Sequence, residues 1–330
     1  MNKNISIHIA TYNHKDYIRK SLDSAINQKL NTDFEIVIGD DYSTDGTREI
    51  LIEYKEKYPD IITLNLQASK GVGMPGHINF VSTLEKCKGK YIAFLDGDDY
   101  WTNENKLQKQ YDFMESNSDF VMCHHDCSSE KAEGIALKRN YNAKHSVSGF
   151  YDACQITFPF FSSAFVKKSV IDEFNLRQWL SDMIMGDFPF WVLVTSRGNA
   201  YYMNEEMAYY RRLANSYSAG FKYSEYIDSR IIFFRKLLKS NEVPDKKFVH
   251  RILSKYYFES SAYYLSDKRI KSSFKNLIFG IANLFSGIGK SKRKIVWNER
   301  LKLSSVFSRF FYGIVSLIKG KKPINGRNRI

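Results

Sequence analysis

Cysteine is scarce in this sequence: among 330 residues there are only four, Cys87, Cys123, Cys127 and Cys154. Four scattered cysteines do not form the dense disulfide framework of small secreted domains, and we therefore expect a reducing, cytoplasmic location. Long apolar runs are also missing, because no stretch reaches the roughly 20 residues that a membrane-spanning helix needs. The N-terminus enters a strand-like alternation at once, without the layout of a signal peptide.

Acidic residues are also scarce, but only in the last third of the chain. Residues 221–330 contain 25 Lys and Arg but only 7 Asp and Glu, whereas residues 1–220 contain 24 and 29. Because the whole positive excess lies in one region, we predict a body at residues 1–218 and a basic helical region at residues 219–330. Such an excess is typical of a segment that meets an anionic partner.

Apolar residues in the basic region recur at helical spacing. They form two stripes: Phe274, Leu277, Ile278, Ile281, Phe285 and Ile288, and then Val306, Phe307, Phe310, Phe311, Ile314, Leu317 and Ile318. Two interpretations stay open: basic amphipathic helices on an anionic membrane surface, or helices packed on the body with solvated lysines. The charge excess favours the membrane surface. No nucleic-acid-binding motif accompanies the charge, so nucleic acid is not expected as a partner.

The central feature of the body is a run of five apolar residues, Tyr91–Leu95, that leads into the carboxylates of Asp96, Asp98 and Asp99. A short β-branched and aromatic run predicts a strand buried on both faces. Ligands of open α/β sheets bind just beyond the carboxyl ends of the strands. Crowded carboxylates repel one another unless a cation lies between them, and these oxygen ligands suit Mg²⁺ or Mn²⁺. The alternative is a solvated turn that is rich in Asp.

Strand-like and helix-like segments alternate on both sides of this run. Strands are predicted at 5–10, 34–38, 61–66 and 120–124, and helices follow Asn13, Gly46, Gly76 and Trp101. This alternation predicts an α/β fold with a mostly parallel, Rossmann-like sheet flanked by helices. The first strand ends in Thr11-Tyr12-Asn13 and the second in Asp40-Asp41, so further polar groups are expected at the edge where the carboxylates emerge.

Four blocks, in order, resemble glycosyltransferase family 2, the inverting enzymes of the GT-A fold. The blocks are Ala10-Thr11-Tyr12-Asn13; Asp40-Asp41-Tyr42-Ser43-Thr44-Asp45-Gly46-Thr47, with Tyr42 where the family has Gly; Phe94-Leu95-Asp96-Gly97-Asp98-Asp99; and Gly186-Asp187-Phe188-Pro189-Phe190-Trp191 with Tyr209-Tyr210-Arg211-Arg212. The resemblance runs from Ser6 to about Ser218. It implies a GT-A catalytic domain at 1–218, with a nucleotide-sugar half at about 1–101 and an acceptor half at about 102–218.

The resemblance also implies roles for the matching residues. Asp187 would be the general base, although an acid in the first turn of a helix also interacts favourably with the helix dipole. Asp98, helped by Asp96, would hold Mn²⁺ or Mg²⁺. The nucleotide sugar would be bound by Ala10, Thr11, Tyr12, Asn13, Asp41, Asn79, Asp96, Gly97, Arg211 and Arg212. The chain departs from the family at His77, where Arg is usual, and at Leu213, where His is frequent.

By this resemblance, the chain is expected to be a metal-dependent inverting glycosyltransferase. It would move a hexosyl or N-acetylhexosaminyl group from a nucleotide sugar, such as a UDP-sugar, to a hydroxyl of a glycan or lipid-linked glycan. The expected setting is cell-surface polysaccharide biosynthesis, in the cytoplasm or peripherally on the inner face of the plasma membrane.

Three alternatives compete with this interpretation. The first is a non-catalytic glycan- or nucleotide-binding protein on the same fold. The second is a dinucleotide-dependent oxidoreductase, because Gly71-Val72-Gly73-Met74-Pro75-Gly76 precedes Asp96 at the spacing of a dinucleotide fingerprint. The third is a zinc site in Cys123-His124-His125-Asp126-Cys127, which has no second ligand pair at finger spacing.

Overall fold

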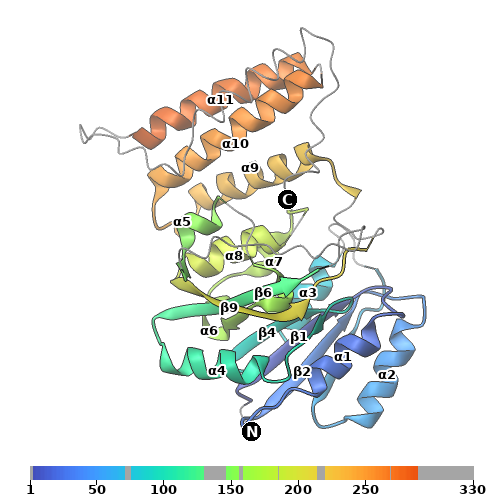
Figure 1. Cartoon of the computed structure of the whole chain (residues 1–330). Coiled ribbons are helices and arrows are strands. Elements are labelled where there is room, and N and C mark those ends of the chain that lie inside the picture. Colours follow the sequence, from blue (N-terminus) through green and yellow to red (C-terminus); the bar gives the residue numbers. More distant parts are fainter. Residues whose placement is uncertain are drawn as a thin grey trace. The chain divides into compact units, whose positions relative to one another are not determined.

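The computed structural model describes residues 3–70, 76–129, 146–155, 159–184, 186–213, 220–267 and 269–288 (Figure 1). The chain divides into two compact units. The first comprises Met1–Ser181 and Gly186–Ser216, and the second comprises Asp182–Met185 and Tyr217–Ile330. The dinucleotide-like loop at 71–75 and the second apolar stripe at 306–318 lie outside the described residues.

The first unit begins with alternating strands and helices, as the sequence predicts. Its elements, in order, are β1 (Ile5–Thr11), α1 (Ile18–Ile26), β2 (Phe34–Asp40), α2 (Thr47–Lys57), β3 (Ile62–Leu66), α3 (His77–Leu84), β4 (Tyr91–Asp96), β5 (Tyr100–Trp101), α4 (Lys106–Ser116), β6 (Phe120–Ser128), β7 (Val147–Ser148), α5 (Phe150–Ala153), the 3₁₀ turn η1 (Phe161–Ser163), β8 (Phe165–Lys167), α6 (Lys168–Ile171), α7 (Leu176–Leu180), α8 (Asp187–Thr195) and β9 (Asn199–Tyr209).

The described strands form one nine-stranded sheet in the order β3-β2-β1-β4-β8-β6-β9-β5, with β7 also paired to β9. The first four neighbours are parallel, and their register places Ala10 of β1 beside Gly39 of β2 and Asp96 of β4. β8 runs antiparallel to both β4 and β6, whereas β6 and β9 are parallel. The carboxyl ends of β1, β2 and β4 therefore meet at one edge, and the predicted mostly parallel α/β sheet is confirmed.

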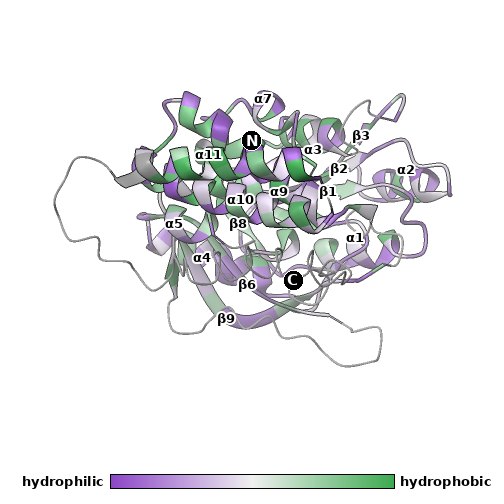
Figure 2. Ribbon diagram, turned by 90° about the horizontal axis from the view of Figure 1, so that it is seen from above, coloured by the Kyte–Doolittle hydropathy of each residue, from purple (hydrophilic) through white to green (hydrophobic). Residues whose placement is uncertain are grey.

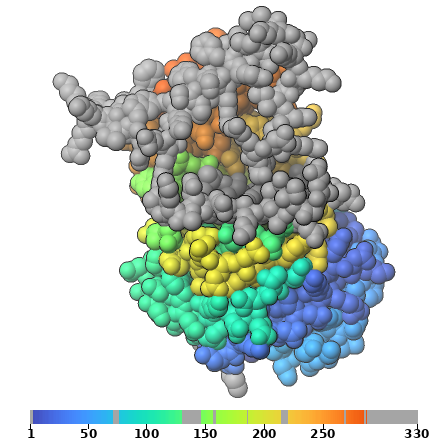
Figure 3. Space-filling view, viewed as in Figure 1, coloured from blue at the N-terminus to red at the C-terminus, as the bar shows by residue number. Residues whose placement is uncertain are grey.

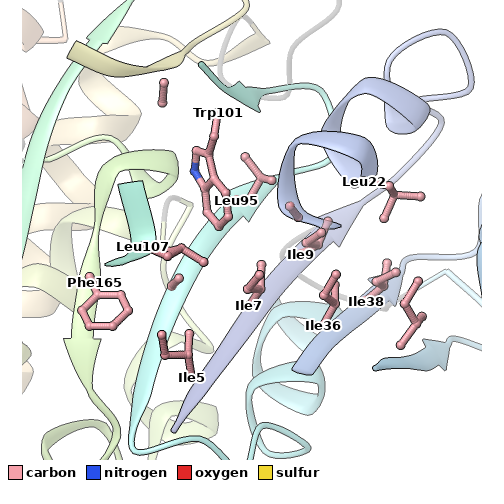
Figure 4. Packing of buried hydrophobic residues seen from close by; sticks show 14 of the residues in the cluster. Ile5, Ile7, Ile9, Leu22, Ile36, Ile38, Leu95, Trp101, Leu107 and Phe165 are labelled. Carbon is pink, nitrogen blue, oxygen red and sulfur yellow. The ribbon is translucent and has the colours of Figure 1, made fainter. Parts of the chain in front are cut away.

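Alternate residues of β1 pack on the two opposite faces of the sheet. Ile5, Ile7 and Ile9 are fully buried on one face beside Ile36 and Ile38 of β2, as Figure 4 shows. His8 points to the other face, where its ring packs against Phe80 and Phe94 at centroid distances of 4.9 and 5.5 Å. Burial lowers the pKa of His8 to about 4, so the imidazole is neutral there. Both faces of the central sheet are thus covered.

The second face is covered by an aromatic cluster from segments far apart in the sequence. Phe94 of β4 meets Phe80 of α3, Phe161 of η1, and Phe190 and Trp191 of α8 at centroid distances from 5.3 to 6.1 Å. This cluster anchors the N-terminal part of α8 against β4. The first turn of α8, which carries Asp187, is thereby held near the carboxyl end of β4.

Strand β9 joins segments that are far apart in the sequence. In the space-filling view its yellow surface lies beside the teal surface of the segment that contains α4 (Figure 3). The Lys109–Glu205 ion pair connects α4 to β9 at this surface. The pairing of Tyr100 with Tyr209, whose rings stack 5.0 Å apart, leads the chain directly from β9 to Arg211.

Some element boundaries differ from those predicted. The apolar spacing after Gly76 predicts a helix through residue 87, whereas α3 ends at Leu84, because the backbone N–H groups of Lys88 and Gly89 donate to the Ser6 hydroxyl oxygen at 3.0 and 2.7 Å. These bonds belong to a turn that enters β4, so the helix cannot continue through it. β6 runs on to Ser128, because its pairing with β9 continues past His124 through two register irregularities.

The second unit contains the helices α9 (Tyr223–Lys239), α10 (Lys246–Ser266) and α11 (Ile270–Ile288). α10 begins at an Asp245 cap, whose side chain accepts a hydrogen bond from the backbone N–H of Phe248. The rings of Phe234 on α9 and Tyr256 on α10 stack at 5.7 Å. Among the helices that the structure describes, none combines the length and the apolar character needed to cross a bilayer.

Candidate active site

The loop after β4 is fixed against the end of β1. The N–H of Gly97 donates to the carbonyl of Ala10 at 2.9 Å, and the N–H of Asp99 donates to the carbonyl of Asp96 at 3.0 Å. A β-carbon at Gly97 would lie 2.6 Å from Thr11 Oγ1, closer than any unbonded carbon and oxygen can approach. Gly97 is therefore required for the close approach of β1, which places Asp96 and Asp98 beside the Thr11 turn.

Carboxylates from two distant segments influence one another at this edge. Burial, followed by the charges of Asp98 and Asp187, raises the pKa of Asp96 to about 7. Asp187 comes from the first turn of α8, so the fold brings together two acids that are 91 residues apart in the sequence. Burial also raises the pKa of Asp99, and the charges of Asp98 and Asp96 add to that effect. The site therefore concentrates negative charge that a cation would relieve.

The chemistry of these donors fits a divalent cation that also binds a ligand. Asp98 is partly exposed, with 19% of its side chain accessible, so its oxygens are available. Within the described ranges, no group of three or more His, Cys, Asp and Glu side chains forms a ready metal cage. Mg²⁺ is commonly bound through one or two carboxylates plus substrate phosphates and water. The predicted metal residues Asp96 and Asp98 suit that mode, and their role stays a prediction.

Asp99 has a structural task that the sequence did not reveal. Its side chain is buried and accepts hydrogen bonds from the Ser162 hydroxyl at 2.5 Å and from the Arg211 backbone N–H at 2.9 Å. The Trp101 indole N–H donates to the Ser162 carbonyl at 2.8 Å. Asp99 therefore ties the loop after β4 to η1 and to the segment after β9.

Arg211 is the cation nearest to these acids among the predicted site residues. Its guanidinium donates to the Asp98 carbonyl oxygen and lies over the rings of Tyr17 and Tyr100, 5.0 and 4.9 Å from their centroids. Arg212, by contrast, is exposed, and Leu213 follows it. Of the two predicted arginines, the described contacts place Arg211 at the carboxylate cluster.

His14 belongs to the site although sequence reasoning gave it no role. Its Nδ1 lies 3.2 Å from Thr11 Oγ1, and its Nε2 lies 4.0 Å from Asp98 Oδ2. Burial lowers the pKa of His14, and the Asp98 charge opposes this effect. The signal was present in the polar turn after β1. The direction in which the His14 side chain points depends on the close packing of Gly97 against the end of β1. Strand patterns in the sequence do not reveal that packing.

Five of the predicted nucleotide-binding residues, Ala10, Thr11, Tyr12, Asn13 and Asp41, lie at or just after the ends of β1 and β2. The partly exposed Tyr12 ring has the Lys70 ammonium 4.2 Å from its centroid, and Lys70 Nζ donates to the Tyr12 hydroxyl at 3.0 Å. Asp41 is buried, and its Oδ2 accepts from the Gly76 N–H at 3.2 Å. Asn79 is also buried, and its amide donates to the Gly39 carbonyl at 2.9 Å. The described contact of Asn79 fastens α3 to β2, and its role in donor binding stays a prediction.

Two residues with positive φ lie in the turns that follow β1 and β2. Asn13 has φ 53° and Tyr42 has φ 65°. The Asn13 N–H donates to Ser43 Oγ, and the Thr44 N–H donates to Asn13 Oδ1, both at 2.9 Å. These bonds join the turns after β1 and β2. The left-handed backbone at Tyr42 explains why glycine suits this position in the resembled block, since a side chain is strained there.

A buried lysine lies beside Trp101, in the segment that follows β4. Lys106 of α4 is fully buried, donates to Gln110 Oε1 at 2.7 Å and lies 4.0 Å from the Trp101 ring centroid. Burial lowers its pKa to about 7. The cysteines of the proposed zinc segment, Cys123 and Cys127, face this lysine from β6. Burial raises the pKa of both thiols, which disfavours the thiolate form that zinc needs.

The stability of the protein relative to a Lys106→Met variant is expected to rise with pH. Below about pH 7 the lysine is charged in both states, so its burial cost is fully present. Above that pH the folded state loses the proton while the unfolded state keeps it up to about pH 10.4. The difference in unfolding free energy should therefore rise by about 2 kcal/mol in total from pH 7 to 9, with a slope that approaches about 1.4 kcal/mol per pH unit above pH 8. Denaturant titrations at several pH values would measure it.

The titratable groups that face Lys106 do not disturb this measurement. Burial raises the pKa of Cys123 to about 12, raises that of Cys127 and lowers that of His125, so none of them titrates between pH 7 and 9 in the folded protein. Titration of the two thiols in the unfolded chain is the same in both proteins and cancels in the difference. Parallel pH profiles for the two proteins would contradict the prediction. The hydrogen bond to Gln110 is lost in the variant at every pH, so it shifts the curve without changing its slope.

Comparison with known proteins agrees with this geometry. The model of the family described as glycosyl transferase family 2 matches residues 6–174. The Escherichia coli UDP-Glc:alpha-D-GlcNAc-diphosphoundecaprenol beta-1,3-glucosyltransferase WfaP is 31% identical over 256 residues, which are 77% of this chain and 92% of that protein. Uncharacterized protein Rv1520 of Mycobacterium tuberculosis is 36% identical over 121 residues, which are 37% of this chain. The match spans about a third (34%) of the length of that mycobacterial relative.

The solved structures include one of similar fold. The structure of S. aureus TarS residues 1–349 with UDP-GlcNAc has a TM-score of 0.66 at 16% identity, covering 96% of this chain and 92% of that chain. This likeness confirms the predicted GT-A type of fold. The family model and the WfaP relative confirm the predicted family. The chain belongs to glycosyl transferase family 2.

Proposed function

We propose that the chain is a metal-dependent inverting glycosyltransferase that takes a sugar from a UDP-sugar. The observation that carries the proposal is that Asp187 of α8 and Asp98 both act on Asp96, while the Arg211 guanidinium is bonded to the Asp98 carbonyl oxygen. A base, a cation site and a fixed positive charge are the three elements that transfer from a diphosphate leaving group requires. The relative WfaP is named for a UDP-Glc donor, and the TarS structure contains UDP-GlcNAc, which supports the choice of nucleotide.

The residues would divide the chemistry as follows. Asp98, with Asp96, would hold a divalent cation, which when bound would neutralise charge on the leaving diphosphate. Asp187 accepts the proton of the acceptor hydroxyl, whose oxygen forms a bond to the anomeric carbon as the bond from that carbon to the diphosphate oxygen breaks. Displacement from the opposite side inverts the anomeric centre. Arg211 offers hydrogen bonds to the diphosphate oxygens, and the exposed Arg212 would act at the rim of the site.

The nucleotide would lie at the ends of β1 and β2. The Tyr12 ring would stack against the base, Asp41 would accept a hydrogen bond from it, and the Ala10 backbone would complete the pocket. Thr11, Asn13 and Asn79 would shape this pocket, and Gly97 would allow the ligand to approach the loop after β4. The Lys70 ammonium beside Tyr12 adds a cation at this end of the site.

We further propose a glycan or lipid-linked glycan as the acceptor, in polysaccharide biosynthesis. The name of WfaP states a diphosphoundecaprenol-linked GlcNAc acceptor for that protein, which supports the lipid-linked choice. The body at 1–218 would carry catalysis, and the basic region at 219–330 would attach the chain to the membrane that holds such an acceptor. This places the protein in the cytoplasm or at the inner face of the plasma membrane.

A screen of nucleotide sugars with Mn²⁺ tests the proposal. Slow hydrolysis of one UDP-sugar, measured as released UDP, is expected even without the acceptor, together with thermal stabilisation by UDP and Mn²⁺. Stabilisation without hydrolysis or transfer to any glycan acceptor would favour a non-catalytic binding protein. Stabilisation by NADH, with none by UDP-sugars, would favour the dinucleotide alternative.

A further inference from the structure

Helix α11 packs on α10 through its polar side. A seam of hydrogen bonds joins the two helices: Ser254 Oγ to the Gly280 carbonyl at 2.8 Å, Asn276 Nδ2 to Ser260 Oγ at 2.9 Å, Ser261 Oγ to the Ser273 carbonyl at 2.8 Å, and His250 Nδ1 with Asn283 Oδ1 at 2.9 Å. A β-carbon at Gly280 would lie 3.0 Å from the Phe258 ring, so the helices approach closely there. The small and polar residues of α11 thus face the protein.

One set of apolar residues of α11 consequently faces outward. Ile270 and Phe274 are each 63% exposed, Ile278 is 51% exposed and Ile281 is 43% exposed. These positions follow the spacing i, i+4, i+8 and i+11, so they lie along one stripe of the helix. Green, hydrophobic bands recur along α11 in Figure 2. This orientation is the reverse of a surface helix that buries its apolar stripe.

The charges around the stripe indicate what covers it. Residues 270–288 contain no Asp or Glu, and the exposed Lys271 and Lys275 lie beside the stripe at its N-terminal end. A second copy of α11 would bring another basic face without a carboxylate to pair with these lysines. An anionic lipid surface supplies both a negative charge for the lysines and an apolar boundary for the stripe.

We propose that α11 lies along an anionic membrane surface, with the outward stripe of Ile270, Phe274, Ile278 and Ile281 inserted at the boundary between headgroups and acyl chains. This inference specifies the membrane contact of the proposed function, but vesicle binding is measured without donor or acceptor. Its failure would therefore leave the proposed transferase chemistry untouched, and loss of turnover would leave the lipid contact untouched.

A single fluorescent label on the stripe tests the contact directly. All four native cysteines are buried, so Ile278→Cys introduces an accessible thiol that takes an environment-sensitive dye selectively. Vesicles of phosphatidylglycerol should shift the dye emission to the blue, and nitroxide-labelled lipids should quench it. Vesicles of phosphatidylcholine should do so far less. Unchanged emission with both kinds of vesicle would overturn the proposal.

Matched variants of the full chain separate the contribution of the apolar stripe to vesicle binding from the contribution of the lysine charges. Phe274→Ser with Ile278→Ser should reduce partitioning onto phosphatidylglycerol vesicles by about tenfold or more. Ile232→Ser on α9 removes a comparable side chain, 45% exposed, and should leave partitioning unchanged. Lys271→Gln with Lys275→Gln should lower binding about tenfold on anionic vesicles and leave it unchanged on neutral ones. Equal co-sedimentation of all variants would reject the stripe.

If a second copy of the chain or another part of the same chain covered the stripe, the dye would report a different result. A dye that already emits in the blue without vesicles, in a protein that sediments as a dimer, would make the stripe an interface between two copies. The same emission from a monomer would mean that another part of the chain covers the stripe. Either outcome would overturn the membrane proposal.

Discussion

Asp187→Asn is expected to lower turnover by about 10² to 10⁴-fold while leaving the affinity for the nucleotide sugar within about twofold. The amide keeps the size of the carboxylate and an oxygen for the 2.7 Å hydrogen bond from the Phe188 N–H. It cannot accept the proton of the acceptor hydroxyl, so the chemical step loses its base. Steady-state transfer rates and calorimetric binding of the donor would separate the two quantities.

The control addresses the competing role of Asp187 as a helix-terminal acid. Glu49 lies exposed in the first turn of α2, so Glu49→Gln removes a similar interaction with a helix dipole. That variant should lose about 0.3–1 kcal/mol of stability and keep normal turnover. Near-normal transfer by Asp187→Asn, with a loss of stability like that of Glu49→Gln, would leave Asp187 only its structural role.

Asp98→Ala is expected to abolish the part of donor binding that depends on a divalent cation. Asp98 is the partly exposed carboxylate of the cluster, whereas Asp99 is buried in hydrogen bonds to Ser162 and Arg211. Calorimetry with UDP should show a clear gain in affinity on adding Mn²⁺ to the unmodified protein and none for the variant. In the absence of metal, the variant should also have a lower pKa at Asp96, because a neighbouring negative charge is gone.

Asp112→Ala supplies the matched control for this experiment. Asp112 is exposed on α4 and accepts a hydrogen bond from Gln108 at 2.7 Å. Its removal should leave the Mn²⁺ effect on UDP binding unchanged. If the unmodified protein binds UDP equally well with and without Mn²⁺, the proposed metal site is wrong, even when transfer itself occurs.

The sequence predicted the parallel part of the sheet well because its signals are local. The runs that end at Ala10, Ile38 and Leu95 are apolar, β-rich and followed by polar turns, which locates strands and their ends. Their parallel order then places the turns at one edge. Asp187 was linked to this edge through the family resemblance, since no local pattern relates α8 to β4.

The contacts that were missed depend on geometry between distant segments. Asp99 meets Ser162 and Arg211, which are 63 and 112 residues away, and no periodicity encodes such pairs. His14 reaches Asp98 only because the loop at Gly97 packs closely on Thr11. The helical period of residues 274–288 predicted α11. It did not reveal which side packs inward, because that depends on the serines and His250 of α10.

The setting of Arg211 has a thermodynamic consequence. Its guanidinium is already held by the Asp98 carbonyl and by the rings of Tyr17 and Tyr100, so its rotamers are restricted before any anion arrives. A free arginine would give up about 2 kcal/mol of side-chain entropy on becoming fixed. Capture of an oxyanion by Arg211 should therefore cost little side-chain entropy and be tighter than capture by a freely rotating arginine.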